Sequence, residues 1–174
     1  MPRTQTRALR AAGTGASTVR GSRSGKFVPA AKGGHAFADP TACERCGAVY
    51  TRKTWRRRDM DPELLGRASW DVCPACRQEA GGEFFGLVEV RGALEPGKRE
   101  EVERRIRSVA ARAEFTQPQR RVIDVRSTDG GLEVLTTSQK LAHRLAHELQ
   151  KAFGGRTGYS WSDRDGRLVA TWEA

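Results

Sequence analysis

Four cysteines form two C-x-x-C pairs, and thiolate sulfur is a ligand that structural zinc prefers. The first pair is Cys43 and Cys46, the second is Cys73 and Cys76, and the sequence has no other cysteine. A two-residue spacer lets one tight turn present both sulfurs to one metal, and Gly47 follows the first pair where a positive φ is needed. The spacing predicts one structural zinc ion in a closed Cys₄ site, which does not activate water.

Two disulfides or a redox-active C-x-x-C pair are the alternatives to a zinc site. Disulfides are typical of secreted proteins, but the N-terminus has no apolar stretch like that of a secretory signal. A redox pair usually lies in a thioredoxin-like βαβ unit, and neither pair is flanked by one. Because a reducing compartment keeps thiols free for zinc, we expect a cytoplasmic protein.

The chain is basic, and its excess charge is concentrated near the N-terminus. The 174 residues include 31 Lys and Arg against 21 Asp and Glu, a net charge of +10 with a pI near 10.2. Residues 1–40 hold 7 of the basic residues and 1 acidic residue, and they lack apolar periodicity. Such a segment cannot bury enough apolar surface to offset its ordering entropy. We expect residues 1–40 to be a disordered basic tail, with an organelle-targeting peptide as the alternative.

A basic run lies between the two cysteine pairs, inside residues 41–82, which we assign to a Cys₄ zinc ribbon. The run consists of Arg52, Lys53, Trp55, Arg56, Arg57 and Arg58. Arginine and lysine contact phosphates, and an exposed tryptophan can stack on a base. The run therefore predicts RNA binding. The alternative is that Trp55 belongs to the zinc core and that the basic side chains are only solvated.

Residues 83–174 have the periodicity of an α+β domain. We predict strands at 84–91, 122–126, 132–135, 156–162 and 167–172, and helices at about 97–115 and 138–153. The order β-α-β-β-α-β plus an extra C-terminal strand indicates a ferredoxin-like fold, an antiparallel sheet with both helices on one face. The other face would be open to a protein partner, and Tyr159, Trp161 or Trp172 could lie there or in the core.

The second predicted helix has a basic face opposite its leucine stripe. On this face Lys140 and Arg144 are further candidate RNA contacts. His143 and His147 have a spacing that can bind metal, but no third ligand is apparent, and a solvated basic face is the preferred interpretation. The sequence shows no phosphate-binding loop and no nucleophile–base pair, and no segment is apolar enough to span a membrane. We therefore expect neither enzymatic activity nor membrane insertion.

Three stretches of the chain resemble a known family. They are residues 42–50 with Trp55, residues 72–77 with 86–88, and residues 136–155 with Trp172. Together they are similar to short bacterial zinc-ribbon proteins, which in turn resemble the N-terminal part of the archaeal and eukaryotic adaptor for nuclear export of the large ribosomal subunit. The resemblance covers residues 42–174 and implies binding to the ribosome or to ribosomal RNA.

The sequence thus predicts a zinc-containing RNA-binding protein that associates with the ribosome as an assembly or dormancy factor. The alternative is a protein–protein adaptor or a transcription-associated zinc protein without a direct role in RNA binding.

Overall fold

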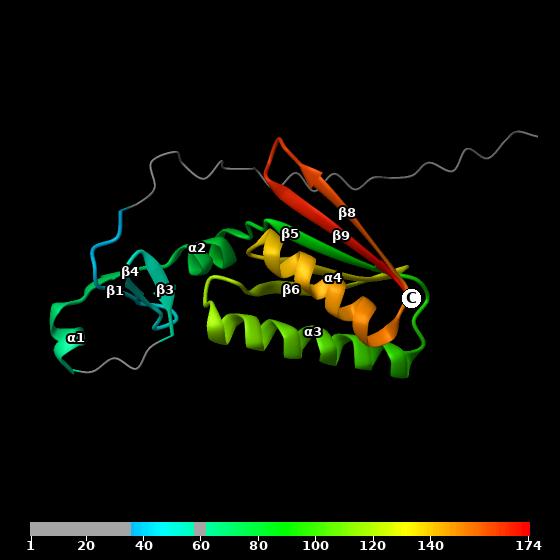
Figure 1. Ribbon diagram of the computed structural model, residues 1–174, viewed down its shortest axis with the longest axis horizontal. Coiled ribbons are helices and arrows are strands. Elements are labelled where there is room, and N and C mark those ends of the chain that lie inside the picture. Colours follow the sequence, from blue (N-terminus) through cyan, green and yellow to red (C-terminus); the bar gives the residue numbers. More distant parts are fainter. Residues whose placement is uncertain (1–35, 58–61) are drawn as a thin grey trace, which may run out of the picture.

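Two modules, the cysteine-containing segment and the segment that follows it, lie one after the other along the long axis of the molecule (Figure 1). The computed structural model describes residues 36–57 and 62–174. The predicted tail therefore lies outside the described residues as far as residue 35, and so does Arg58. In these two described ranges, no helix is both long enough and apolar enough to cross a membrane.

The cysteine module has a small four-stranded sheet of order β3-β2-β1-β4. Strand β1 pairs antiparallel with β2 and parallel with β4, so the chain segments before and after the basic run meet at β1. The elements of the module are β1 (Thr41–Cys43), β2 (Val49–Thr51), β3 (Thr54–Arg56), α1 (Pro62–Arg67), β4 (Ser69–Asp71) and α2 (Pro74–Gly81).

Three aromatic rings form the core of the cysteine module. Phe37 and Trp55 meet edge to face with their ring centroids 4.9 Å apart, and Tyr50 lies 5.4 Å from each of them. The three rings pack against the cysteines, and Trp55 is only 7% exposed. Because Phe37 takes part, the packed module begins before residue 41, inside the segment that the sequence assigned to the tail.

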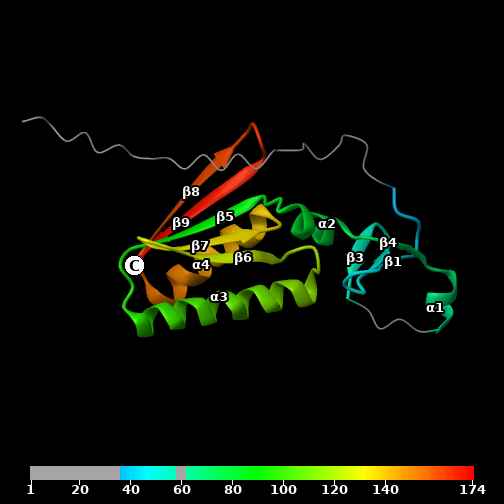
Figure 2. The same cartoon turned by 180° about the vertical axis from the view of Figure 1, so that it is seen from behind.

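The second module is an α+β domain, as predicted, in which two helices pack on one face of a five-stranded sheet. Figure 1 shows α4 in front of the strands, and Figure 2 shows the strands in front of α4. The elements are β5 (Gly86–Arg91), α3 (Pro96–Thr116), β6 (Val122–Thr128), β7 (Gly131–Thr136), α4 (Gln139–Phe153), β8 (Arg156–Ser162) and β9 (Arg167–Glu173).

The sheet order is β6-β7-β5-β9-β8, so the last strand lies inside the sheet. The elements from β5 to β8 follow the expected order β-α-β-β-α-β, but β9 is inserted between β5 and β8. It pairs parallel with β5 and antiparallel with β8, which corrects the expectation of a wholly antiparallel sheet. The physical reason is composition: β9 supplies Leu168, Ala170 and Trp172 to the core, whereas β8 consists mostly of polar residues and glycine.

The core of this domain lies between the two helices and the sheet. Apolar residues recur every three or four positions along each helix, and alternate residues of β5, β7 and β9 face them. Trp172 is fully buried, and its indole nitrogen donates a hydrogen bond of 2.9 Å to the carbonyl of Gly154. At the start of β5 the packing is so close that a Cβ added to Gly86 would lie 2.5 Å from the Cβ of Ala142.

The two helices begin where the sequence provides the appropriate signals. Ser138 is the N-cap of α4, and its side chain accepts a hydrogen bond of 3.2 Å from the backbone N–H of Leu141. Pro96 occupies the first turn of α3, where a missing N–H costs nothing. These two signals set the first turns of the helices that carry the basic surfaces described below.

Candidate metal centre and basic surfaces

The four cysteine sulfurs are clustered around a single point. All four Sγ atoms are within 4.8 Å of one another, with Cys43 and Cys76 3.8 Å apart and Cys46 and Cys73 3.7 Å apart. A tetrahedral zinc ion with Zn–S bonds of ~2.3 Å requires sulfurs that are ~3.8 Å apart. A disulfide would bring two sulfurs to ~2.05 Å, and all four thiols are free. The cysteines are therefore positioned to bind one metal ion.

Two local structures present these sulfurs to one point. The first pair lies on a turn after β1, in which the backbone N–H of Gly47 donates to the carbonyl of Cys43 over 2.9 Å and Gly47 has a φ of 70°. The second pair lies at the start of α2, with Cys73 as the N-cap and Cys76 in the first turn. The backbone N–H of Cys73 donates to Sγ of Cys43 over 3.3 Å, and such a hydrogen bond favours the thiolate form that binds a metal.

Burial and hydrogen bonding act in opposite directions on the thiols. Burial acts to raise the pKa of Cys43, but hydrogen bonds from the backbone of Cys73, Cys46 and Arg45 lower it overall to about 7. Burial raises the pKa of Cys76 far above its usual range, although the hydrogen bond from Arg121 acts to lower it. Since a metal binds thiolates, it must displace the proton held by a thiol such as Cys76.

Arg121, which precedes β6 in the second module, reaches into the cysteine site. Its Nη1 donates to Sγ of Cys76 over 3.4 Å and to a carboxylate oxygen of Glu79 over 3.1 Å. Its Nε donates to the carbonyl of Pro118 over 2.6 Å, and its side chain is only 7% exposed. Burial acts to lower the pKa of Arg121, but its hydrogen bonds to Cys46 and Cys76 and the charge of Glu79 raise it overall. A buried, charged guanidinium therefore joins the two modules at the metal ligands.

Two further contacts cross the same junction. The backbone N–H of Ala75, between the second pair of cysteines, donates to the side chain of Gln119 over 3.2 Å. Arg57, at the end of the hairpin formed by β2 and β3, forms an ion pair of 2.5 Å with Glu114 of α3. Gln119 and Arg121 lie in the loop of residues 117–121, which has no periodicity or motif from which their contacts could be predicted.

The basic run occupies the hairpin of β2 and β3, and its residues differ in role. Trp55 packs in the small core and does not present its ring to solvent, which is the alternative that the sequence left open. Arg57 is engaged by Glu114, as described above. Arg52, Lys53 and Arg56 are exposed.

The turn of this hairpin has an unusual backbone conformation. Arg52 and Lys53 have φ angles of 49° and 61°, the left-handed region that Asn and Gly normally occupy in a two-residue hairpin turn. The backbone N–H of Arg52 donates to a carboxylate oxygen of Asp39 over 2.8 Å and helps to hold the turn. Next to it, Thr51, Arg52, Arg56 and Arg57 line a hollow of about 420 Å³.

The exposed tryptophan of the cysteine module is Trp70, in edge strand β4, which is 52% exposed. No pattern in the sequence distinguished Trp70 from Trp55 as the exposed ring. In so small a module, the buried aromatic ring is the one that packs against the cysteines. The spacing of aromatic residues along the chain does not show which ring this is.

Lys140 and Arg144, the candidate contacts in α4, are exposed. His143 is also exposed, and its ring stacks on Tyr159 with the centroids 4.5 Å apart. In the part of the chain that the structure describes, the four cysteines are the one group of three or more His, Cys, Asp or Glu placed to hold a metal ion. His143 and His147 therefore belong to the solvated face, as preferred from the sequence.

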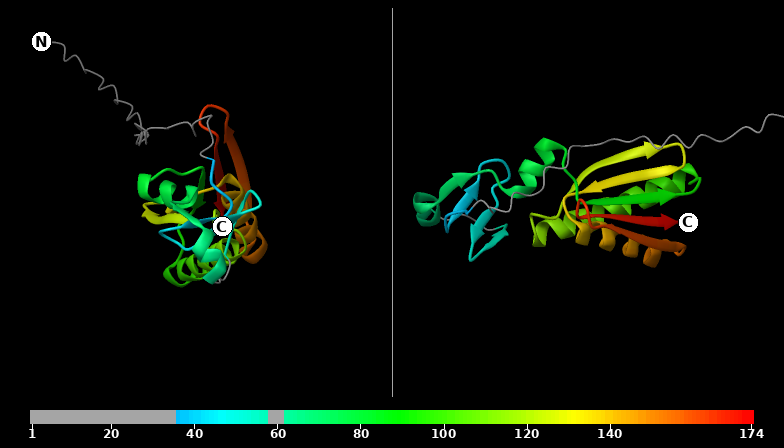
Figure 3. Two further views of the ribbon diagram at one scale, coloured as in Figure 1. Left: turned by 90° about the vertical axis from the view of Figure 1, so that its left-hand side faces the viewer. Right: turned by 90° about the horizontal axis from the view of Figure 1, so that it is seen from above.

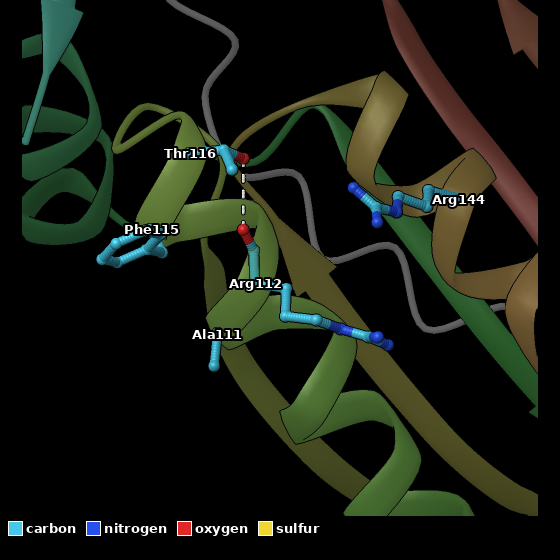
Figure 4. A pocket seen from close by; sticks show the side chains of 5 residues that line it. All are labelled: Ala111, Arg112, Phe115, Thr116 and Arg144. Atoms are coloured by element: carbon cyan, nitrogen blue, oxygen red, sulfur yellow. Dashed lines mark hydrogen bonds between the residues drawn. The ribbon is translucent and has the colours of Figure 1, made fainter.

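Arg144 also lines a hollow at the end of α3 (Figure 4). The hollow has a volume of about 460 Å³ and is bounded by Ala111, Arg112, Phe115 and Thr116 in addition to Arg144. Figure 4 shows Arg112 and Arg144 extending into the space between α3 and α4, with Phe115 projecting from the other side of the end of α3. Phe115 is 73% exposed.

Comparison with known families gives a match that falls on the second module. The family model described as NMD3, second domain, matches residues 83–164, from the segment before β5 to the turn after β8. This match confirms the resemblance to the ribosomal export adaptor that the sequence indicated. Comparison with curated proteins gives no match.

Proposed function

We propose that this protein is a zinc-containing RNA-binding protein that associates with the ribosome in the cytoplasm. The observation that carries this proposal is the match of residues 83–164 to the second domain of NMD3. The adaptor that the sequence resembles acts on the large ribosomal subunit, and the same class of partner suits a chain with a net charge of +10.

Zinc is the metal that best suits the cysteine site. Four thiolates select a soft or borderline metal, and tetrahedral coordination by sulfur alone is typical of structural zinc. A zinc ion bound by four thiolates leaves the site with a net charge of about −2, which the guanidinium of Arg121 partly offsets at 3.4 Å from Cys76. Because all four positions are taken by protein ligands, such a site is structural, and we propose no catalytic role for it.

The hairpin of the cysteine module provides a surface for phosphate. Left-handed backbone at a residue other than glycine costs ~1 kcal/mol or more, and the two turn positions nevertheless carry Arg52 and Lys53. Strained backbone is often found at functional sites. The turn projects Arg52 and Lys53, and Arg52 also lines a hollow with Arg56 and Arg57. Because Arg57 is paired with Glu114, the cations offered to the phosphate oxygens of an RNA backbone are Arg52, Lys53 and Arg56.

Sedimentation through a sucrose gradient tests the proposed function. We expect the tagged full-length protein to migrate with ribosomal particles at low salt and to return to the top of the gradient at high salt, because phosphate contacts release counterions. Ribonuclease treatment before sedimentation should also release the protein. A protein that stays at the top of the gradient at low salt would instead favour a protein–protein adaptor.

A further inference from the structure

Two aromatic side chains of strand β8 are partly exposed on the side of the sheet that the helices cover. Tyr159 pairs with Ala170 and Trp161 pairs with Leu168, and both partners are completely buried in the core. Directly paired residues project to the same side of a sheet, so the rings of Tyr159 and Trp161 lie on the helix side. They remain 38% and 57% exposed because β8 is the edge strand, beyond the cover of α4.

Helix α4 holds this edge in place. The ring of His143 stacks on Tyr159 with an angle of 20° between the two planes. The hydroxyl of Thr157 donates to the side chain of Gln150 over 3.4 Å, and Gln139 donates to the carbonyl of Gly166 in the turn after β8. Contacts at both ends and in the middle therefore fix β8 against α4 before any partner binds.

Cations without carboxylate partners lie beside these rings. Lys140, Arg144 and Lys151 recur at four- and seven-residue steps and share the outer face of α4. Among the described residues, no carboxylate forms an ion pair with any of the three, whereas Glu148 of the same helix is bound by Arg105 over 2.5 Å. The positive charge of this face is therefore available to an external anion.

Arg144 connects this face to the hollow at the end of α3. This hollow has the same combination of a cation and an aromatic ring, supplied by Arg112 and the exposed Phe115. Arg112, like Arg144, has no ion pair in the described part of the chain. A strip of cations with aromatic rings on either side thus runs across the helix side of the domain.

We propose that the α4–β8 surface, defined by Lys140, His143, Arg144, Tyr159 and Trp161, binds an unpaired segment of RNA. The two cations contact phosphates, and the ring of Trp161 stacks on a base. This inference rests on the proposed function and adds to it the form of the RNA and the residues that contact its bases.

The combination of rings and cations favours an unpaired strand over other anions. A base stacks on an aromatic ring only when its face is free, and the faces of bases in an A-form duplex are covered by their neighbours. A duplex would gain from Lys140 and Arg144 but not from Trp161. An acidic peptide would likewise use the cations, but it has no base to stack on the indole.

Binding of a short fluorescent oligouridine to the zinc-loaded full chain tests the proposal, with an RNA duplex of equal length as the comparison. Uridine stacks weakly on itself, so its bases are free. Replacing Trp161→Leu should weaken binding of oligouridine by ~5- to 100-fold, with little effect on the duplex and no change in the salt dependence. Trp161→Phe, which keeps an aromatic ring, should retain most of the affinity. Melting curves should show that both variants fold, since Trp161 lies on an exposed edge.

The charge contribution is tested with a matched pair of arginine variants. Arg144→Gln should lower the slope of log affinity against log salt by ~0.7, the value for one phosphate contact of a single strand. Arg126→Gln removes the same charge from β6, at the opposite edge of the sheet, and should leave the slope unchanged.

Three results would overturn the proposal, and each is distinct from failure of the proposed function. If folded Trp161→Leu binds oligouridine as the original chain does, or if the original chain sediments with ribosomes but does not bind oligouridine, the α4–β8 surface is not a site for unpaired RNA. The proposed function would then stand without it. If oligoglutamate binds with the same dependence on Trp161 and oligouridine does not bind, the surface is a site for an acidic protein partner.

Discussion

Arg121 donates a hydrogen bond to Sγ of Cys76 over 3.4 Å, although the two residues belong to different modules. The same nitrogen contacts Glu79 of α2, and the backbone N–H of Arg121 donates to the side chain of Thr137 over 2.8 Å. The cysteine site and the sheet of the second module are thus joined through one side chain. Metal bound at the cysteines therefore stabilises the contact between the modules as well as the cysteine module itself.

Replacing Arg121→Met should weaken metal binding. The change removes the positive charge beside Cys76 and keeps an unbranched side chain in the buried space. Loss of such an outer contact typically reduces metal affinity by ~10- to 100-fold. Competition with a chromogenic chelator measures the affinity. Arg120→Met is the matched control, because the neighbouring Arg120 has no ion pair among the described residues; equal affinities for the two variants would contradict the prediction.

Removing the metal should unfold the cysteine module and leave the second module folded. The core of the cysteine module consists of three aromatic rings and the cysteines, so this module buries little apolar area without the metal. The second module has a separate core between α3, α4 and the five-stranded sheet. Chelation should preserve most of the helical circular dichroism while the fluorescence of buried Trp55 shifts to longer wavelength. Mass spectrometry of the native protein should find one zinc ion per chain, and Cys43→Ser should show the chelated spectrum without chelator. Simultaneous loss of the helical signal would show that the second module depends on the metal.

Replacing Arg52→Asn together with Lys53→Gly should change stability and binding in opposite directions. Asn-Gly is the favoured pair for this turn, so the cysteine module should gain ~1 kcal/mol in free energy of unfolding. Ribosome association should weaken, and its salt slope should fall by roughly 1.5, because two phosphate contacts are lost. The double variant with Gln at both positions removes the charges but keeps the strained turn, so it should lose affinity without gaining stability. Equal affinity of all three proteins would exclude a role for the turn in binding.

Replacing Gly86→Ala should destabilise the second module. The added methyl group would lie 2.4 Å from Oγ1 of Thr136 and 2.9 Å from the carbonyl oxygen of Ser138, so β5 or the start of α4 must move. Forcing a methyl group into so tight a space typically costs ~1–3 kcal/mol, which urea unfolding can measure. Gly97→Ala, in the first turn of α3 with no atom within 4 Å of its Cβ, should be neutral or stabilising by up to ~1 kcal/mol. A Gly86 variant as stable as the Gly97 variant would show that the packing is looser than described.

The secondary structure of the second module could be predicted from the sequence because its signals are local. The helices at 97–115 and 138–153 differ from α3 and α4 by about one residue at their ends, and the five strands were placed correctly. Each of these signals determines structure within a few residues along the chain. They are the spacing of the leucines, the Ser138 cap and the Asp165-Gly166 turn. The parallel pairing of β9 with β5 could not be predicted in this way, because a period of two tells which residues share a face but not which strand lies beside them.

In the site, the metal ligands were predictable and their surroundings were not. The two sulfurs of each C-x-x-C pair are held close together because each pair lies within a single turn. Arg121 is one of many arginines, and only the packing of the two modules places it beside Cys76. The sequence likewise singled out Trp55, while the structure buries this ring with Phe37 and exposes Trp70, because three-dimensional packing selects the core.

The position of β9 has a consequence for how the domain folds. Strand β8 joins the sheet only through β9, and β9 joins it by pairing with β5, across almost the whole length of the domain. Pairings so distant in sequence form late, because a long loop must close before any contact is gained. We expect β8, with Tyr159 and Trp161, to join the sheet only after this step. If β8 binds RNA as proposed, an incompletely folded chain should lack this binding edge, so binding through β8 would require a completed sheet.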